Sequence, residues 1–212
     1  MTSNAPRSDA SGSSQHEPFT VRHAVIDLMR RLGMTSVFAN PGSTELPLFR
    51  DFPQDFRYVL GLQEAVVVGM ADGYAQATRN ASFVNLHSAA GVGNAMGNIF
   101  TAFRNRTPIV ITAGQQARSI LPFDPFLAST QATELPKPYV KWSIEPARAE
   151  DVPLAIARAY HVAMQEPRGR AGVDSRRRLG PRRGAGAGTR SEYRDAAGAV
   201  RAGADRRGAR CL

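Results

Sequence analysis

Residues 83–113 read FVNLHSAAGVGNAMGNIFTAFRNRTPIVITA, in which two apolar runs flank a helix-like stretch. The first run, residues 83–86, leads through a loop of small residues at 88–93 into a predicted helix that ends near Asn105. The second run, residues 107–113, has the length and composition of a buried strand. A strand, a helix and another strand in succession predict two parallel strands joined by a helical crossover.

The same alternation continues on both sides of this stretch. Further helices are predicted at residues 20–32, 64–78 and about 150–165, and further strands at 36–39 and 58–62. Thr20 can cap the first helix and Gly33 can end it. The fold class is therefore α/β, a parallel sheet with helices on both faces. Ligands of such sheets bind where strands lead into helices, which indicates the loops at 40–43, 63–64 and 87–94.

Composition divides the 212 residues into three segments. Residues 1–17 have almost no apolar content, so we expect a disordered leader. Residues 18–169 carry the apolar periodicity and are predicted to form one domain. Residues 170–212, a basic tail rich in Arg, Gly and Ala, are expected to be disordered. No apolar run approaches the roughly 18 residues that cross a bilayer, and no secretion signal is present, so we expect a cytoplasmic protein with no membrane contact.

The net charge of +9 lies at one end of the chain. Between Arg168 and Leu212, thirteen arginines accompany four acidic residues, whereas the remainder is neutral. A tail that binds nucleic acid is one interpretation of this charge. The single cysteine, Cys211, and four histidines without ligand spacing exclude a disulfide framework within the chain and predict no metal site.

Three polar side chains fall in the predicted loops. Glu64 lies at a strand-to-helix junction, where a buried carboxylate needs a partner, although the helix dipole alone also favours an acid there. His87 ends the strand at 83–86 and is either a site residue or a hydrogen-bonded core histidine. Ser43, taken alone, is most simply a helix cap. The glycines of residues 91–97 miss the spacing of a dinucleotide-binding fingerprint, and close helix packing explains them equally well.

Several motifs together carry a family resemblance. They are Asn40-Pro-Gly-Ser43, Glu45-Leu-Pro47, Leu62-Gln-Glu-Ala65, Gly69-Met-Ala-Asp-Gly-Tyr-Ala75, Asn85-Leu-His-Ser-Ala-Ala-Gly91 and Gly93-Asn-Ala-Met96. The stretch from Thr20 to Gly169 resembles the N-terminal, pyrimidine-binding domain of thiamine-diphosphate-dependent 2-keto acid decarboxylases, in particular the benzoylformate decarboxylases. The resemblance implies the thiamine-diphosphate-binding fold and a lyase of the mandelate pathway that converts benzoylformate to benzaldehyde and CO2. A sibling resembling acetolactate synthase or oxalyl-coenzyme-A decarboxylase is the alternative.

The resemblance also implies roles for individual residues. Glu64 matches a glutamate that hydrogen-bonds the aminopyrimidine ring of thiamine diphosphate and promotes loss of the C2 proton of the thiazolium ring. His87 matches an active-site histidine that handles protons. Ser43 matches a serine that binds the substrate carboxylate, and Gly42 beside it lets the substrate approach the backbone. The residues expected near the cofactor, besides Glu64, are Asn40, Pro41, Gly42 and Asn94.

The resemblance stops at Gly169. The family continues with a strand and further domains, which bind the diphosphate and its Mg²⁺ through a Gly-Asp-Gly motif, so no metal site is expected in this chain. Residues 173–184 can be encoded so that the same bases, read one base later, give Ser-Ile-Pro-Val-Asp-Asp-Trp-Asp, close to the family's own sequence. We therefore expect a frameshift shortly before Val173 and a truncated, inactive chain. Full-length members are expected to be homo-oligomers, dimers or tetramers.

Overall fold

The structure is a computed structural model that describes residues 19–169 and 171–175. The expected leader, the chain from residue 176 onward and the suggested nucleic-acid-binding tail lie outside the described residues. The elements follow in the order α1 (Val21–Arg31), β1 (Ser36–Asn40), α2 (Leu46–Phe49), β2 (Arg57–Leu60), α3 (Glu64–Thr78), β3 (Ser82–Leu86), α4 (Ser88–Arg104), β4 (Ile109–Gly114), β5 (Trp142–Ile144), α5 (Val152–Met164) and β6 (Ala171–Ser175). Short 3-10 helices occupy Leu121–Phe123 and Ala149–Asp151.

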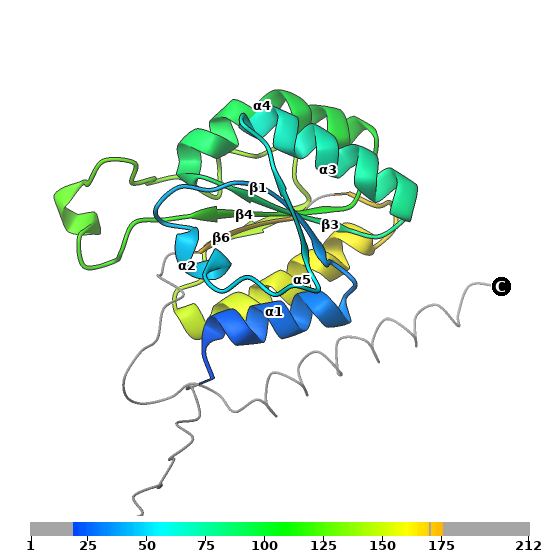
Figure 1. Cartoon of the computed structure of the whole chain (residues 1–212). Helices are drawn as coiled ribbons and strands as arrows, with labels where there is room; N and C mark the ends of the chain where they lie inside the picture. Colours follow the sequence, from blue (N-terminus) through cyan, green and yellow to red (C-terminus); the bar gives the residue numbers. More distant parts are fainter. Residues whose placement is uncertain (1–18, 170, 176–212) are drawn as a thin grey trace, which may run out of the picture.

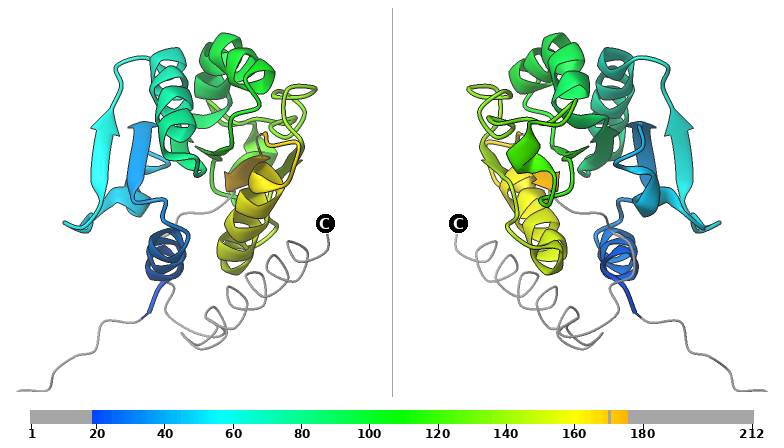
Figure 2. Two further views of the ribbon diagram at one scale, coloured as in Figure 1. Left: turned by 90° about the vertical axis from the view of Figure 1, so that its right-hand side faces the viewer. Right: turned by 90° about the vertical axis from the view of Figure 1, so that its left-hand side faces the viewer.

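The described strands form one parallel sheet in the order β2-β1-β3-β4-β6-β5. Helices α3 and α4 cover one face of it, and α1 and α5 cover the other (Figure 1). The two layers of helices are also separate in the side views of Figure 2. This arrangement confirms the predicted α/β class. None of the described helices is both long enough and apolar enough to cross a membrane.

Each face of the sheet has its own apolar core, and β3 contributes to both. Phe83 packs into the cluster on the α1 and α5 side, whereas Val84 packs into the cluster on the α3 and α4 side. Successive side chains of a strand point to opposite faces, so a strand covered on both faces needs apolar residues in succession. This requirement explains the continuous apolar runs in the sequence.

Two helix starts agree with the sequence predictions. Thr20 caps α1 in a capping box with His23, and Gly33 follows the helix with a φ of +69°, a conformation that glycine adopts easily. Helix α3 begins at Glu64, and the side chain of Gln63 caps it by accepting a hydrogen bond from the N–H of Val66 at 3.1 Å.

Residues 88–93 are the first turns of α4, so the loop predicted there is wrong. His87 is the N-cap of α4, and the N–H of Gly91 donates to its carbonyl oxygen at 2.8 Å. At Gly91, α4 packs closely against the start of α3. A Cβ at position 91 would lie 3.2 Å from Oε1 of Glu64.

Strand β6 lies beyond the boundary predicted at residue 169. Residues 171–175 pair in parallel with β4 on one side and with β5 on the other. Strand pairing uses backbone N–H and C=O groups, so the absence of an apolar pattern in this segment does not prevent it. The short strand β5 was not predicted either. The described sheet therefore includes residues up to Ser175.

Candidate active site

The carboxyl ends of β1, β3 and β4 lie side by side at one edge of the sheet. Asn40 is in register with Leu86, and Leu86 is in register with Ala113. The segments that follow these strands therefore meet, as the sequence predicts for a ligand site in a parallel sheet.

Glu45 is the residue on which these three segments converge. Its side chain is only 2% exposed. Oε1 accepts hydrogen bonds from the backbone N–H of Ser88 at 3.2 Å and of Gly114 at 2.8 Å, and Oε2 accepts one from the backbone N–H of Gly42 at 2.8 Å. The carboxylate therefore ties the ends of β1, β3 and β4 together.

Two side chains also contact this carboxylate. The hydroxyl of Thr44 donates to Oε1 of Glu45 at 2.7 Å, and Nδ1 of His87 lies 2.8 Å from Oε2. Sequence reasoning missed Glu45 as a site residue, although it stands in the quoted motif Glu45-Leu-Pro47. A signal was present, because this acid follows a Pro-Gly turn at the end of a buried strand.

His87 has one ring nitrogen engaged and one open. Nδ1 faces Glu45, whereas Nε2 makes no hydrogen bond with any described residue. Gly42 lies against the imidazole ring so closely that a Cβ at position 42 would overlap it. The side chain is 26% exposed, so the open nitrogen belongs to a partly accessible ring.

Glu64 is buried at the N-terminus of α3, with 9% of its surface exposed. Its Oε2 accepts a hydrogen bond from Nδ2 of Asn94 at 3.2 Å. Its Oε1 accepts no hydrogen bond from the described part of the chain, and Gly91 lies close beside it. A buried carboxylate with an unused acceptor oxygen is suited to bind a donor from outside the chain.

The start of α4 connects the two carboxylates. His87, its N-cap, contacts Glu45, and Asn94, two turns into the helix, contacts Glu64. Between them Ser88 has a φ of +53°, which is strained for a residue with a side chain, and its buried Oγ has no hydrogen-bond partner among the described residues. Strain of this kind is frequent at functional sites.

The structure places the remaining predicted site residues at the same edge without joining all of them. Asn40 and Pro41 are half-buried at the end of β1. Ser43 is exposed and makes no hydrogen bond with a described residue. It is not a helix cap, because the N-cap of α2 is Glu45. The geometry thus pairs Gly42 with His87 and Glu64 with Asn94, and leaves Ser43 unpaired within the described residues.

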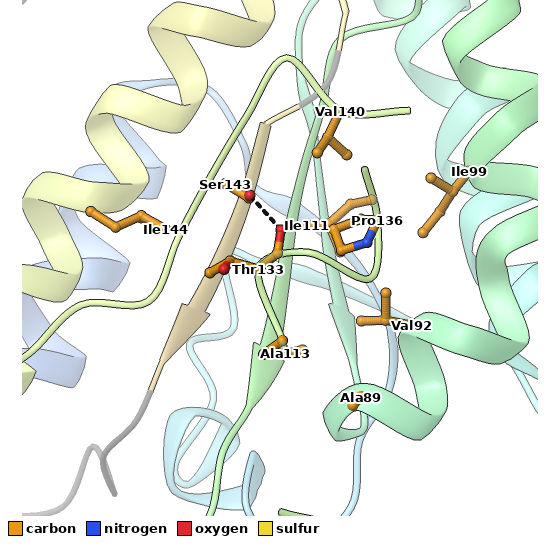
Figure 3. Close-up of a pocket in the computed structure, with 11 residues that line it drawn as sticks. Ala89, Val92, Ile99, Ile111, Ala113, Thr133, Pro136, Val140, Ser143 and Ile144 are labelled. Atoms are coloured by element: carbon orange, nitrogen blue, oxygen red, sulfur yellow. Dashed lines mark hydrogen bonds between the residues drawn. The ribbon is translucent and has the colours of Figure 1, made fainter. Parts of the chain in front are cut away.

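An apolar pocket lies between α4, β4 and the segment that leads into β5 (Figure 3). Its lining includes Val92, Ile99 and Ile111, and its polar members, Ser143 and Thr133, bond to each other, with the Ser143 hydroxyl donating to the Thr133 carbonyl at 2.8 Å. No titratable side chain lines it. Within the described residues, no group of three or more His, Cys, Asp or Glu side chains could hold a metal ion.

Comparisons with known proteins agree on one family. A family profile described as "Thiamine pyrophosphate enzyme, N-terminal TPP binding domain" matches residues 19–135. The chain is 55% identical to a benzoylformate decarboxylase of Pseudomonas aeruginosa over 149 residues, which are 70% of this chain and 28% of that protein. It is 30% identical over 141 residues to the acetolactate synthase large subunit of Haemophilus influenzae, covering 66% of this chain and 24% of that one.

Solved structures show the same relation. Benzoylformate decarboxylase from Polynucleobacter necessarius superposes with a TM-score of 0.75 at 48% identity, over 81% of this chain and 33% of that chain. A putative thiamin diphosphate-dependent enzyme from Mycobacterium smegmatis gives 0.74 at 51% identity, over 80% and 34%. The chain thus spans about a third or less of these relatives. It belongs to the thiamine pyrophosphate enzymes and corresponds to their N-terminal TPP binding domain.

Proposed function

We propose that this chain is the cofactor-activating N-terminal part of a thiamine-diphosphate-dependent decarboxylase of aromatic 2-keto acids, which converts benzoylformate to benzaldehyde and CO2. The observation that carries the proposal is the buried Glu64, which keeps one carboxylate oxygen open at the edge of the sheet. The identity of 55% to a benzoylformate decarboxylase favours this substrate class.

The described residues fit the pyrimidine half of thiamine diphosphate. A ring nitrogen of an aminopyrimidine donates a hydrogen bond to a carboxylate once it carries a proton, and the open Oε1 of Glu64 can accept that bond. Asn94 holds the other carboxylate oxygen, while Gly91 keeps the space beside the carboxylate free of a side chain. When bound, the cofactor supplies the electron sink for the departing carboxyl group.

The chain's own residues then have separate tasks. Glu64 shares a proton with a pyrimidine ring nitrogen, and its carboxylate accepts the hydrogen bond when the ring holds that proton. His87 gives and takes protons through its open Nε2. Ser43 offers an exposed hydroxyl to the substrate carboxylate. Asn40, Pro41 and Gly42 bind the cofactor from the end of β1, where Gly42 lies against the ring of His87.

Other parts of the proposal concern the full-length protein. We place the diphosphate and Mg²⁺ in the part of the full-length relatives that this chain does not cover. The active enzyme is proposed to be a cytoplasmic homo-oligomer. Its reaction is proposed to belong to mandelate breakdown. The chain alone is expected to be inactive, and turnover of benzoylformate by the purified 212-residue chain would contradict that. Resequencing across codon 173 tests the proposed frameshift, because an uninterrupted frame in fresh DNA rules it out.

A chimera tests the proposed function. Residues 19–169 of this chain replace the matching segment of the Pseudomonas aeruginosa enzyme, and benzaldehyde formation from benzoylformate is measured. Turnover supports the proposal. The second candidate, an acetolactate-synthase-like activity, is favoured by the 30% identity to that enzyme. A folded chimera that fails with benzoylformate but forms acetolactate from pyruvate would favour the second candidate.

A further inference from the structure

We infer that Glu45 is a positioning residue, which fixes the imidazole of His87 in the tautomer that carries its proton on Nδ1. Nε2 is then the nitrogen open for proton transfer. The inference deepens the proposed function and rests on it, because His87 matters to catalysis only if the site performs that reaction.

Hydrogen-bond donors surround the Glu45 carboxylate. Oε1 receives three donors, the hydroxyl of Thr44 and the N–H groups of Ser88 and Gly114. Oε2 receives the N–H of Gly42 and faces Nδ1 of His87 at 2.8 Å. A carboxylate oxygen that accepts from its other neighbours also accepts from the imidazole, so Nδ1 must carry a proton.

Backbone donors hold the Glu45 carboxylate in place from several directions. The N–H groups of Gly42, Ser88 and Gly114 lie at or just beyond the carboxyl ends of three different strands. The acceptor for His87 is thereby fixed by the sheet itself and by buried backbone groups. A ligand that orients a histidine through its second nitrogen needs such support.

The plane of the His87 imidazole ring is also fixed. Gly42 lies against one side of the imidazole, where a Cβ would overlap Cε1, Nδ1 and Cγ. Thr44 lies 3.5 Å from Nδ1 through its hydroxyl oxygen, which can accept part of the same hydrogen bond. Since Nε2 has no partner among the described residues, the arrangement leaves one defined nitrogen for an incoming group.

Glu45→Gln is the decisive variant, because it keeps the shape and changes the donor pattern. Three donors converge on Oε1, so the amide oxygen is expected at that position. The amide NH₂ then faces Nδ1 of His87 and also the N–H of Gly42, which loses its acceptor in either tautomer of His87. Two donors cannot face each other, so the imidazole proton is expected to move from Nδ1 to Nε2.

The experiment uses the full 212-residue chain labelled with ¹⁵N in its histidines, with no cofactor or substrate. Long-range ¹H–¹⁵N correlation spectra at pH 8 report which ring nitrogen is protonated, and a His87→Asn variant identifies the His87 signal. The wild type is expected to show a proton on Nδ1, and Glu45→Gln a proton on Nε2. Asp72→Asn, which replaces another buried acid in α3 by its amide, should leave the His87 tautomer unchanged.

Two results overturn the inference. One is a wild-type His87 with its proton on Nε2, which is decisive even if Glu45→Gln does not fold. The other is a folded Glu45→Gln variant that keeps the proton on Nδ1. Because the spectra need neither substrate nor cofactor, their outcome is independent of whether the chimera decarboxylates benzoylformate.

Discussion

Nδ2 of Asn94 donates a hydrogen bond to Oε2 of Glu64 at 3.2 Å, which joins the second turn of α4 to the first residue of α3. The bond holds one oxygen of a buried carboxylate and leaves the other for a ligand. Asn94 itself is exposed, so its contribution is to the site rather than to the core.

Asn94→Ala should therefore reduce activity without unfolding the domain. Loss of a hydrogen bond to a charged group costs about 1.5–3 kcal/mol. Because Asn94 is exposed to water, we expect a smaller cost here. We expect turnover of the chimera to fall by about threefold to tenfold, since roughly 1.4 kcal/mol corresponds to tenfold. Steady-state kinetics and a thermal melt measure both effects. An unchanged kcat would show that Asn94 does not orient Glu64.

Two glycine substitutions should have opposite effects on stability. Gly42→Ala would place a Cβ in the imidazole of His87, so we expect a loss of about 1–3 kcal/mol in the free energy of unfolding. Gly97→Ala lies in α4, where a Cβ meets nothing within 4 Å, and should gain about 0.5–1 kcal/mol from helix propensity. Denaturant unfolding of the 212-residue chain checks both values. Equal effects would contradict the contact between Gly42 and His87.

An ion pair on the surface predicts a pH dependence. The hydrogen bond from Arg30, at 2.6 Å, lowers the pKa of the Asp55 carboxyl below its ordinary value of 3.8. A lowered pKa in the folded state stabilises the fold above the ordinary value, and that stabilisation is lost as the pH falls through the lowered pKa. Asp55→Asn should therefore melt slightly below wild type at pH 7, and the two melts should converge in acid. A gap that widens below pH 3.8 would contradict this sign.

Much of the fold follows from local sequence signals. The bounds of α3 and the capping of α1 by Thr20 were predictable because helix periodicity and caps are properties of neighbouring residues. Strands β5 and β6 were not predictable in this way. Residues 142–144 and 171–175 pair through their backbones, and the strands beside them decide where they lie.

The site residues also differ in whether the sequence alone could locate them. Glu64 and His87 stand at strand-to-helix junctions, which the sequence pattern locates. Glu45 gains its importance from partners far along the chain, 42 residues away at His87 and 69 residues away at Gly114. Such a convergence is created only when the parallel strands come together, so periodicity and spacing do not reveal it.

Glu64→Gln in the chimera is the most direct test of the account. The amide keeps the size of the side chain but removes the charge, and proton handling by a positioned side chain contributes roughly 10²-fold or more. Asp72→Asn is the matched control, since it changes a second buried acid of α3 about two turns away. The account predicts that Glu64→Gln loses benzoylformate turnover by roughly 10²-fold or more while the melting temperature stays near that of the chimera, and that Asp72→Asn keeps most of its turnover. Near-wild-type turnover by Glu64→Gln would contradict the assignment of Glu64 as the residue that activates the cofactor.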